Sequence, residues 1–269
     1  MIKIMAVKEV KLDTTEKVFA ALTAAEFDAT LKRNRSPFLF RGLPNVDYKL
    51  TTSLRWNCKE KAAELEPSIL RNFAKYAATT SPLNSCWEQM VIGQHHGLPT
   101  RLMDWTYSPL AALHFATSGE DITMMDRHDA VVWAVDITEM NALLPARYQE
   151  VLHQEHAYLF TIDMLKQVAK DLDTYDSDMG QDSIVLLEPP SIDQRIINQY
   201  SYFSVIPSGI KDIETFLDEK TTRTVKYILN KEIRWQIRDV LDQCNVNERT
   251  VYPGLDGLAS WIKRHYYVR

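Results

Sequence analysis

The sequence predicts an α+β protein in which helices flank a central mixed or antiparallel sheet. Helix capping signals bracket residues 85–95 and 108–119, and the valine-rich apolar run at 130–137 is typical of a strand buried on both faces. The chain has 269 residues, of which 45% are hydrophobic and 25% charged, so it can bury a substantial core. Because neither a repeat nor a low-complexity linker marks a boundary, we predict one domain over residues 1–269.

The first 30 residues are predicted to form a helical element packed on this domain. We expect a helix over 14–27 with Asp13 as its N-cap. Its apolar stripe would contain Val18, Leu22 and Ala25.

A short strand is expected next, over the aromatic segment 37–42, which a glycine closes. Residues 48–54 would pair with it as the other arm of a hairpin. This arrangement places Arg41 at the end of a strand.

Two helices are predicted in the middle of the chain, with a polar loop over 97–106 between them. Ser85 and Glu88 have the spacing of a capping box, and Gly97 suits a left-handed C-terminal cap. Ser108 followed by proline predicts the start of the second helix.

The remaining chain predicts a surface loop, further strands and a helical end. The aspartate-rich stretch at 171–183 has few apolar residues and is expected to be an exposed loop. Further strands are expected at 130–137, 184–187, 202–206 and 223–229. The C-terminal element at 231–269 is expected to be helical and to pack on the domain, with helices at 231–244 and 255–266.

Charge and cysteine usage exclude several classes of protein. The net charge of -5 and the pI near 5.8 argue against a general basic field that coats nucleic acid, although a local basic site stays open. The three cysteines lack metal-ligand spacing, and the N-terminus has no secretory apolar core. With no apolar run of membrane-spanning length, we expect a cytoplasmic protein.

The segment from Gln94 to Trp105 concentrates groups that can carry chemistry. On the first central helix, Gln94 and His95 share the stripe of apolar residues and would point inward, either into a satisfied core network or into a wet cleft. The loop that follows adds Thr100, Arg101 and Asp104. Arg101 and Asp104 would pair with each other if this segment were only a rigid structural corner.

Arg41 is the strongest candidate for binding an anion. The glycine at position 42 would let the backbone approach a phosphate together with the guanidinium's donors. The competing interpretation is an arginine that caps a helix or pairs with Asp104.

The histidines outside this segment favour structural roles. His114 has apolar neighbours on the second central helix and is expected in the core. His153 and His156 have a spacing that could face one metal ion, but a third ligand is missing nearby, so we predict no metal site.

Five segments resemble the FRG-domain family of bacteria and phages, in the family's order and over nearly the whole chain. They are FRG at 40–42, TTSLRW at 51–56, WEQMVIGQHHGLPTRLMDWTYSPLAALHFAT at 87–117, RIINQYSYFSV at 195–205 and VYPGLDGLASWI at 251–262. The chain departs from the family at Tyr200, Ser201 and Tyr202, where the family tends to have a glycine between Gln199 and the phenylalanine.

The order of these segments is also similar, more weakly, to the ADP-ribosyltransferase fold. That resemblance implies Arg41 as the anchor for NAD and Gln199 or Glu188 as a late polar partner. NAD cleavage passes through an oxocarbenium-like state, so it needs an anion anchor, an aromatic stack and a carboxylate or amide rather than a metal. Asp104 or Glu188 could supply the carboxylate, and Trp105 or Phe115 the stack. The remaining NAD-binding candidates are Gly42, Gln94, His95, Thr100 and Arg101.

The leading hypothesis is therefore an NAD-dependent ADP-ribosyltransferase that acts as a toxin-like effector, in anti-phage defence or a related context. RNA or DNA is preferred over protein as the acceptor, and an antitoxin protein is the expected partner. The second hypothesis is a non-enzymatic module that recognises a nucleotide or phosphate. A metal-dependent nuclease has the least support, because it would need clustered carboxylates.

Overall fold

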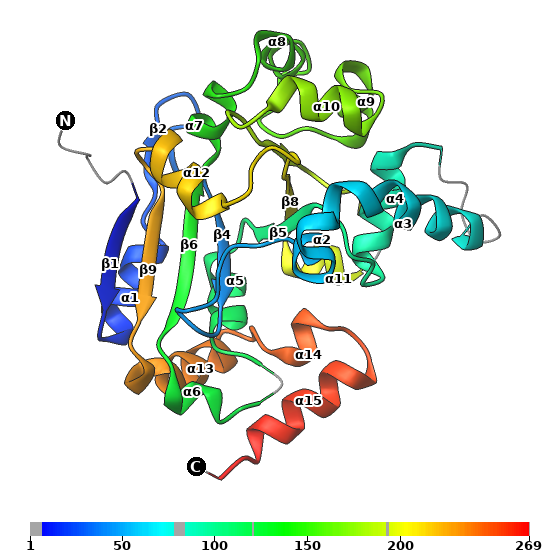
Figure 1. Cartoon of the computed structure of the whole chain (residues 1–269). Coiled ribbons are helices and arrows are strands. Elements are labelled where there is room, and N and C mark those ends of the chain that lie inside the picture. The colour runs from blue at the N-terminus through cyan, green and yellow to red at the C-terminus, as the bar shows by residue number, and fades with distance from the viewer. Residues whose placement is uncertain (1–6, 78–83, 120, 192–193, 269) are drawn as a thin grey trace.

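A seven-stranded mixed sheet organises the computed structural model, which describes residues 7–77, 84–119, 121–191 and 194–268 (Figure 1). The strands of this sheet are β1 (Lys8–Leu12), β4 (Phe38–Leu43), β5 (Leu102–Thr106), β6 (Ala130–Asp136), β7 (Val185–Leu187), β8 (Ser201–Val205) and β9 (Val225–Leu229). Their spatial order is β1-β9-β6-β4-β5-β8-β7, and within the described chain every neighbouring pair is antiparallel except β1 with β9. The predicted α+β class with a mixed sheet is confirmed.

Helices surround the sheet, and a small hairpin lies outside it. The helices are α1 (Thr15–Leu22), α2 (Ser53–Cys58), α3 (Ala62–Ala77), α4 (Cys86–His95), α5 (Pro109–Ala116), α6 (Met124–Arg127), α7 (Ile137–Ala142), α8 (Ala146–Gln154), α9 (Ile162–Val168), α10 (Leu172–Met179), α11 (Gln194–Gln199), α12 (Ile213–Lys220), α13 (Arg234–Gln243), α14 (Glu248–Val251) and α15 (Leu255–His265). Short 3-10 turns cover Lys59–Lys61 and Lys231–Ile233, and β2 (Glu26–Asp28) pairs with β3 (Arg33–Arg35).

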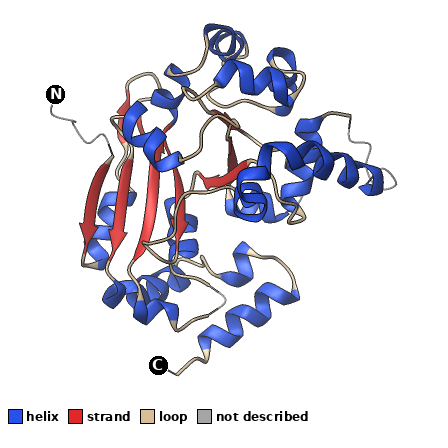
Figure 2. Cartoon of the chain, in the orientation of Figure 1, coloured by secondary structure: helices blue, strands red, loops and turns tan. Residues whose placement is uncertain are grey.

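The strands fall into two groups, which Figure 2 shows in red. Strands β1, β9, β6 and β4 lie side by side, and β6 is fully buried along its length as its valine-rich sequence predicts. Strands β5, β8 and β7 form the second group. The groups meet at β4 and β5.

The two central helices begin where their capping signals predict. In α4 both arms of the capping box form, since Ser85 accepts from the backbone of Glu88 and the Glu88 carboxylate accepts from the backbone of Ser85. Gly97 follows with φ +82°. Ser108 caps α5, with proline in its first turn.

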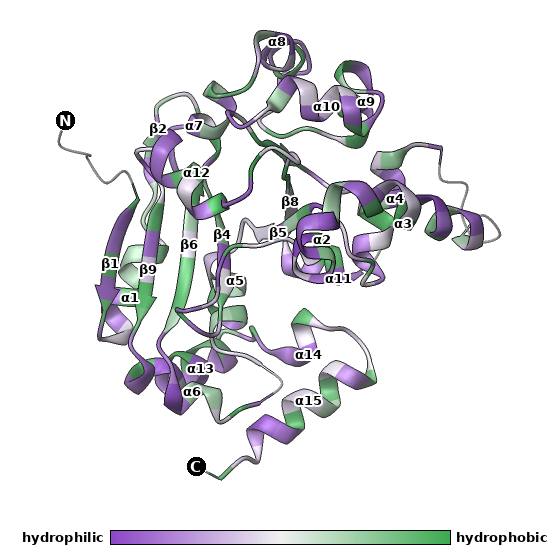
Figure 3. Cartoon of the chain, in the orientation of Figure 1, coloured by the Kyte–Doolittle hydropathy of each residue, from purple (hydrophilic) through white to green (hydrophobic). Residues whose placement is uncertain are grey.

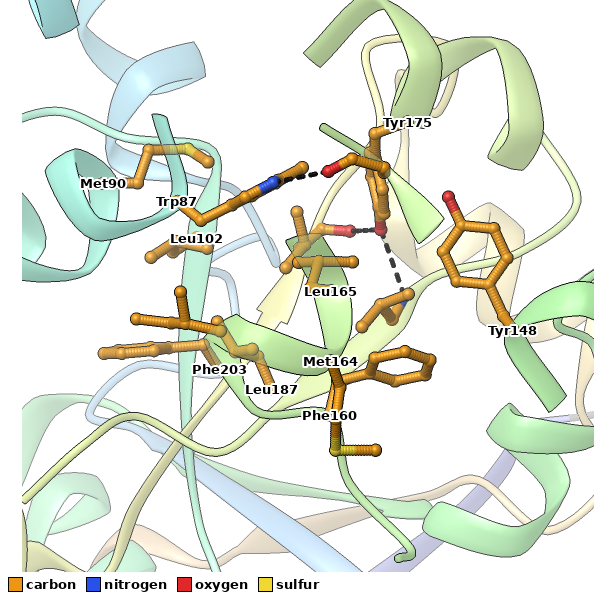
Figure 4. Close-up of a cluster of buried hydrophobic side chains, with 14 of the residues drawn as sticks. Trp87, Met90, Leu102, Tyr148, Phe160, Met164, Leu165, Tyr175, Leu187 and Phe203 are labelled. Carbon is orange, nitrogen blue, oxygen red and sulfur yellow. Dashed lines mark hydrogen bonds between the residues drawn. The ribbon is translucent and has the colours of Figure 1, made fainter. Parts of the chain in front are cut away.

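A buried aromatic cluster fixes α4 against the second group of strands (Figure 4). The Trp87 indole donates to the Ala169 carbonyl at 2.7 Å, and its ring meets Tyr175 edge-on at 5.4 Å between centroids. The Tyr175 hydroxyl donates to the Val205 carbonyl at 2.7 Å and accepts from the Val185 backbone. The position of α4 is therefore set by paired polar atoms as well as by apolar packing.

The prediction of a wholly helical N-terminal element was wrong. Residues 8–12 form β1 at the edge of the sheet, and α1 ends at Leu22 because Ala25 is exposed and a longer helix would bury nothing. The N-cap is Thr14 rather than Asp13, whose carboxylate instead binds the Lys17 ammonium at 2.6 Å.

Three loop and strand predictions also need correction. Residues 48–52 do not pair with β4, because Thr52 caps α2 and turns the chain into a helix. Part of the predicted loop 97–106 is strand β5, with four of its five residues buried. The aspartate-rich stretch 171–183 contains α10, in which Asp171 is the N-cap and Tyr175 is buried.

Candidate functional site

The site lies where β4 and β5 part. These strands share one register pair, Phe40 with Thr106, whereas β4 has six with β6 and β5 has five with β8. Both strands continue past this pair as strands, β4 toward Leu43 and β5 back toward Leu102. Arg41 is the first residue of β4 beyond the pair, so its side chain can lie between the two strands.

Arg41 reaches across this divergence to Asp104. Its Nη1 donates to the Asp104 carbonyl oxygen at 2.5 Å and lies 3.8 Å from the carboxylate Oδ2. The Nε atom is buried and has no hydrogen-bond partner among the described residues. Burial lowers the pKa of Arg41, and the Asp104 charge opposes that shift. The guanidinium thus retains a donor that an anion could use.

Asp104 is held from the other side by α4. The Gln94 amide donates to Asp104 Oδ2 at 3.0 Å, and Gln94 Oε1 accepts from the Thr100 hydroxyl at 2.7 Å. Thr100 is fully buried and its hydroxyl also accepts from the backbone of Leu102, whereas the Asp104 side chain is 56% exposed. The four residues form one chain of contacts that begins in the core and ends at the surface.

Four of the predicted site residues therefore meet in space: Arg41, Gln94, Thr100 and Asp104, which are called the Arg41 group below. The distant arginine and the segment after α4 do share one site, and that site reaches the surface through Asp104. The competing interpretation, that Arg41 pairs with Asp104, also describes the observed contact.

The close packing of α5 requires glycine at position 42, whereas the sequence-based hypothesis assigned this glycine to a phosphate contact. A Cβ on this residue would lie 1.9 Å from the Ala112 carbonyl oxygen and 2.7 Å from the Ala116 nitrogen. Helix α5 therefore crosses β4 with direct backbone contact. This close approach occupies the space that the phosphate hypothesis gave to a ligand.

Arg101 pairs with Glu66 and Asp176, so the alternative in which it pairs with Asp104 does not hold. Its Nε and Nη2 donate to Glu66 at 2.9 and 2.5 Å, and its Nη1 donates to Asp176 at 2.6 Å. Despite burial, the two carboxylates raise the pKa of Arg101. Arg101 ties α3 and α10 to the start of β5, which is a structural role rather than the predicted contact with NAD.

The two aromatic candidates have described contacts with residues other than Arg41. Trp105 is 5% exposed and donates from its indole to the Ser204 hydroxyl at 2.9 Å, within the core on one face of the sheet. Phe115 is half-buried on α5 with its ring edge-on to His114 at 5.5 Å. His114 itself is fully buried, as predicted for a core residue.

The contacts described for the two late polar candidates do not include Arg41, although the Gln199 carbonyl accepts from the hydroxyl of Thr106, the residue paired with Phe40. Glu188 is exposed just after β7, near Tyr202, where burial raises the tyrosine pKa and the Glu188 charge adds to the shift. Gln199 is 9% exposed and donates from its amide to the Val251 carbonyl at 3.3 Å. Of the residues predicted to act on the ribose, Asp104 is the one that lies beside Arg41.

Two residues near the site had no role in the sequence-based hypothesis. The Arg195 guanidinium lies 5.2 Å from the centre of the Tyr252 ring. Burial raises the pKa of Tyr252, and its nearby charges include Arg195, which opposes the shift, and Asp104, which adds to it. With His95, both residues line a cavity of about 560 Å³. The signal was present in the sequence, because Arg195 and Tyr252 belong to the two late segments that resemble the FRG family.

Within the described ranges, no group of three or more His, Cys, Asp and Glu side chains could hold a metal ion, and the His153 and His156 rings lie 6.4 Å apart. No helix in the same part of the chain is long and apolar enough to cross a membrane.

Comparison with known proteins identifies one family. Residues 36–123, about a third of the chain, match the family model of the FRG domain, and this range contains all four residues of the Arg41 group. No curated protein and no solved structure matches the chain. The matched range runs from β4 through α5 and includes both Arg41 and Asp104, so this part of the chain is an FRG domain.

Proposed function

We propose that this protein is an NAD-dependent ADP-ribosyltransferase whose dinucleotide binds where β4 and β5 part. The observation that carries the proposal is the buried, unpaired Nε of Arg41 beside the half-exposed carboxylate of Asp104. A cationic donor next to an accessible carboxylate suits a ligand that has an anionic pyrophosphate and a ribose that becomes cationic during reaction.

In this proposal Arg41 binds the pyrophosphate and Asp104 faces the nicotinamide ribose. The bond between C1′ of that ribose and the nicotinamide nitrogen breaks, and its electron pair leaves with neutral nicotinamide. The Asp104 carboxylate stabilises the oxocarbenium-like ribose until the acceptor's nucleophile bonds to C1′ and loses its proton.

Gln94 is a positioning residue. Its amide donates to Asp104 Oδ2 while its own oxygen accepts from buried Thr100, so the carboxylate is held by a group that is fixed in the core. Such fixing lowers the reorganisation needed in the transition state.

The proposed acceptor is a nucleic acid, RNA or DNA. The proposed role is that of a toxin-like effector in anti-phage defence or a related context. An enzyme that modifies the cell's own nucleic acid would have to be inhibited until it is needed, so an antitoxin protein that inhibits it is part of the same proposal.

The test is nicotinamide release and label transfer from NAD labelled in its adenylate half, with RNA, DNA or cell lysate as acceptor. Arg41→Ala and Asp104→Asn should each lower the rate by about 100-fold, as for loss of one transition-state contact. Arg127→Ala is the matched control, because this arginine is 62% exposed on α6. Equal inertness of the wild type and the Arg41 and Asp104 variants with all three acceptors would refute the enzyme.

A non-enzymatic nucleotide-binding module is the second candidate, and one observation favours it. Both groups of the site already have internal partners, since Arg41 bonds to the Asp104 carbonyl and Gln94 to the Asp104 carboxylate. NAD binding that depends on Arg41, without nicotinamide release under any acceptor condition, would select this module.

A further inference from the structure

The C-terminal arm, defined as residues 247–267 with α14 and α15, presents a hollowed surface next to the Arg41 group. Two cavities adjoin there. One of about 560 Å³ is lined by His95, His96, Arg195, Tyr252, Asp256 and Ser260. The second, of about 550 Å³, shares Tyr252 and Ser260 with the first and continues past Lys263 and Tyr267. The two cavities have Tyr252 and Ser260 in common, and the surface that they line together is called the groove below.

The groove is lined by three cations, Arg195, Lys263 and Arg264, and two carboxylates, Asp256 and Glu248, whereas the chain as a whole carries a net charge of -5. Arg264 is paired with Glu248 and Asp242. The exposed charged side chains of the lining are Arg195, Lys263 and Asp256. Figure 3 shows that the part of α15 nearest the C-terminus is hydrophilic.

Two aromatic rings, those of Tyr252 and Tyr267, line the groove together with these cations. The Arg195 guanidinium lies 5.2 Å from the centre of the Tyr252 ring. Tyr267 is 37% exposed and stacks on Trp235 with an interplanar angle of 3°. Rings for base stacking and cations for phosphates are the two elements of a surface for single-stranded nucleic acid.

Buried ion pairs hold the arm against α13, which favours a groove that is formed before a ligand binds. Arg264 donates to Glu248 at 2.6 Å and to Asp242 at 2.8 Å, which ties α15 to α14 and α13. Gly257 lets the first turn of α15 approach the backbone that follows α14, because a Cβ there would lie 1.8 Å from the Tyr252 carbonyl oxygen. A preformed surface loses less conformational entropy on binding.

We propose that the groove on either side of Tyr252 binds single-stranded nucleic acid, with phosphates at Arg195 and Lys263 and bases against the aromatic rings. The biological meaning rests on the proposed function, since His95 in the groove directly follows Gln94 and a bound strand would be delivered to Asp104. The binding itself needs no NAD.

The test is fluorescence anisotropy of labelled oligo(U) and oligo(dT) of about 12 nucleotides, within the roughly 4 to 16 typical of such sites. The full chain is titrated between about 50 and 200 mM salt. The double variant Arg195→Glu/Lys263→Glu should bind at least about tenfold more weakly, and the slope of log K against log salt should fall by about 1.4, about 0.7 for each lost phosphate contact.

The matched control is Lys8→Glu/Lys11→Glu, which makes the same change in net charge on exposed positions of β1, at the far edge of the sheet. Its affinity should stay within about twofold of wild type, because neither lysine lines the groove and salt screens exposed charges that make no direct contact. Thermal unfolding of both double variants checks that they fold.

The inference is overturned if wild type binds neither oligonucleotide, which would assign the groove to a ligand of another class. It is also overturned if the two double variants weaken binding equally. Oligonucleotide binding without nicotinamide release would instead refute the transferase and leave the groove standing.

Discussion

Replacing Arg101 by methionine tests whether this arginine is structural, as its contacts indicate, or part of the site. In the folded protein its guanidinium is 6% exposed and bonds to Glu66, which is 1% exposed. The third partner, Asp176, is 21% exposed. Arg101→Met keeps most of the apolar volume and leaves the Glu66 carboxylate buried without its cation.

The expected loss is about 3 to 5 kcal/mol, the usual cost of leaving one charge of a buried pair uncompensated. Loss of the contact with Asp176 should contribute little to this destabilisation, because water can reach that carboxylate. Urea unfolding followed by tryptophan fluorescence measures the difference at neutral pH. Against a total of roughly 5 to 15 kcal/mol for a typical domain, such a loss is easily resolved.

Two further variants separate this explanation from a general charge effect. Lys220→Met removes a surface pair with Asp182, which is 76% exposed, and should cost less than about 1 kcal/mol. Glu66→Met/Arg101→Met should recover much of the loss, since removing both charges leaves no unpaired ion. An Arg101→Met loss below about 1 kcal/mol, equal to the surface control, would refute the buried-pair reasoning.

Three other changes probe the backbone and the core. Gly42→Ala should destabilise by about 2 kcal/mol or more in thermal unfolding, because its methyl group would overlap the Ala112 carbonyl at 1.9 Å; an unchanged Tm would contradict the close crossing. Tyr200→Gly should stabilise by about 1 kcal/mol, because this tyrosine has φ +50° and glycine adopts that conformation without strain; a loss of stability would show that its ring contact matters more. Burial, with the nearby Arg238 charge, lowers the pKa of His114 from 6.5 to about 3. The unfolded chain therefore takes up a proton at His114 as pH falls below 6.5 while the folded protein does not, so stability should fall by up to about 1.4 kcal/mol per pH unit toward pH 4. His114→Gln should remove this contribution to the change of unfolding free energy with pH. Parallel pH profiles of wild type and variant would contradict the assignment to His114.

The secondary structure was predictable where local chemistry decides it. The capping box at Ser85, the glycine at 97 and the Ser108 cap need a few neighbouring residues only, and all three appear as predicted. The buried strand at 130–136 followed from its composition.

Elements fixed by tertiary packing were missed. Strand β1 is polar along much of its length and is a strand because it pairs with β9, more than 200 residues away. The aspartate-rich helix α10 buries Tyr175 and Met179 and binds Arg101 through Asp176. Pairing partners that distant leave no signal in a local window of sequence.

The site was predictable in part. The residue types pointed to Arg41 and the segment after α4, and the fold joins Arg41, Gln94, Thr100 and Asp104. The sequence could not show which carboxylate faces Arg41, because that depends on where β4 and β5 separate. For the same reason Glu188 and Gln199 were expected beside Arg41, whereas the hydrogen bonds described for Gln199 are with Thr106, Val251 and Ser201.

The departure at Tyr200 has a structural explanation. The residue after Gln199 has φ +50°, a left-handed conformation that glycine adopts freely. The FRG family's tendency to glycine fits this backbone. In this chain a tyrosine adopts the same conformation, with its ring 6.3 Å from Tyr107.

Calorimetric titration of NAD into wild type and Arg41→Ala tests the central claim most directly. If the unpaired guanidinium donor anchors the pyrophosphate, wild type should bind NAD and the variant should bind at least about tenfold more weakly, the loss expected for one charge-assisted contact. Equal affinities, or the absence of binding to the wild type, would contradict the claim that the parting of β4 and β5 is a nucleotide site.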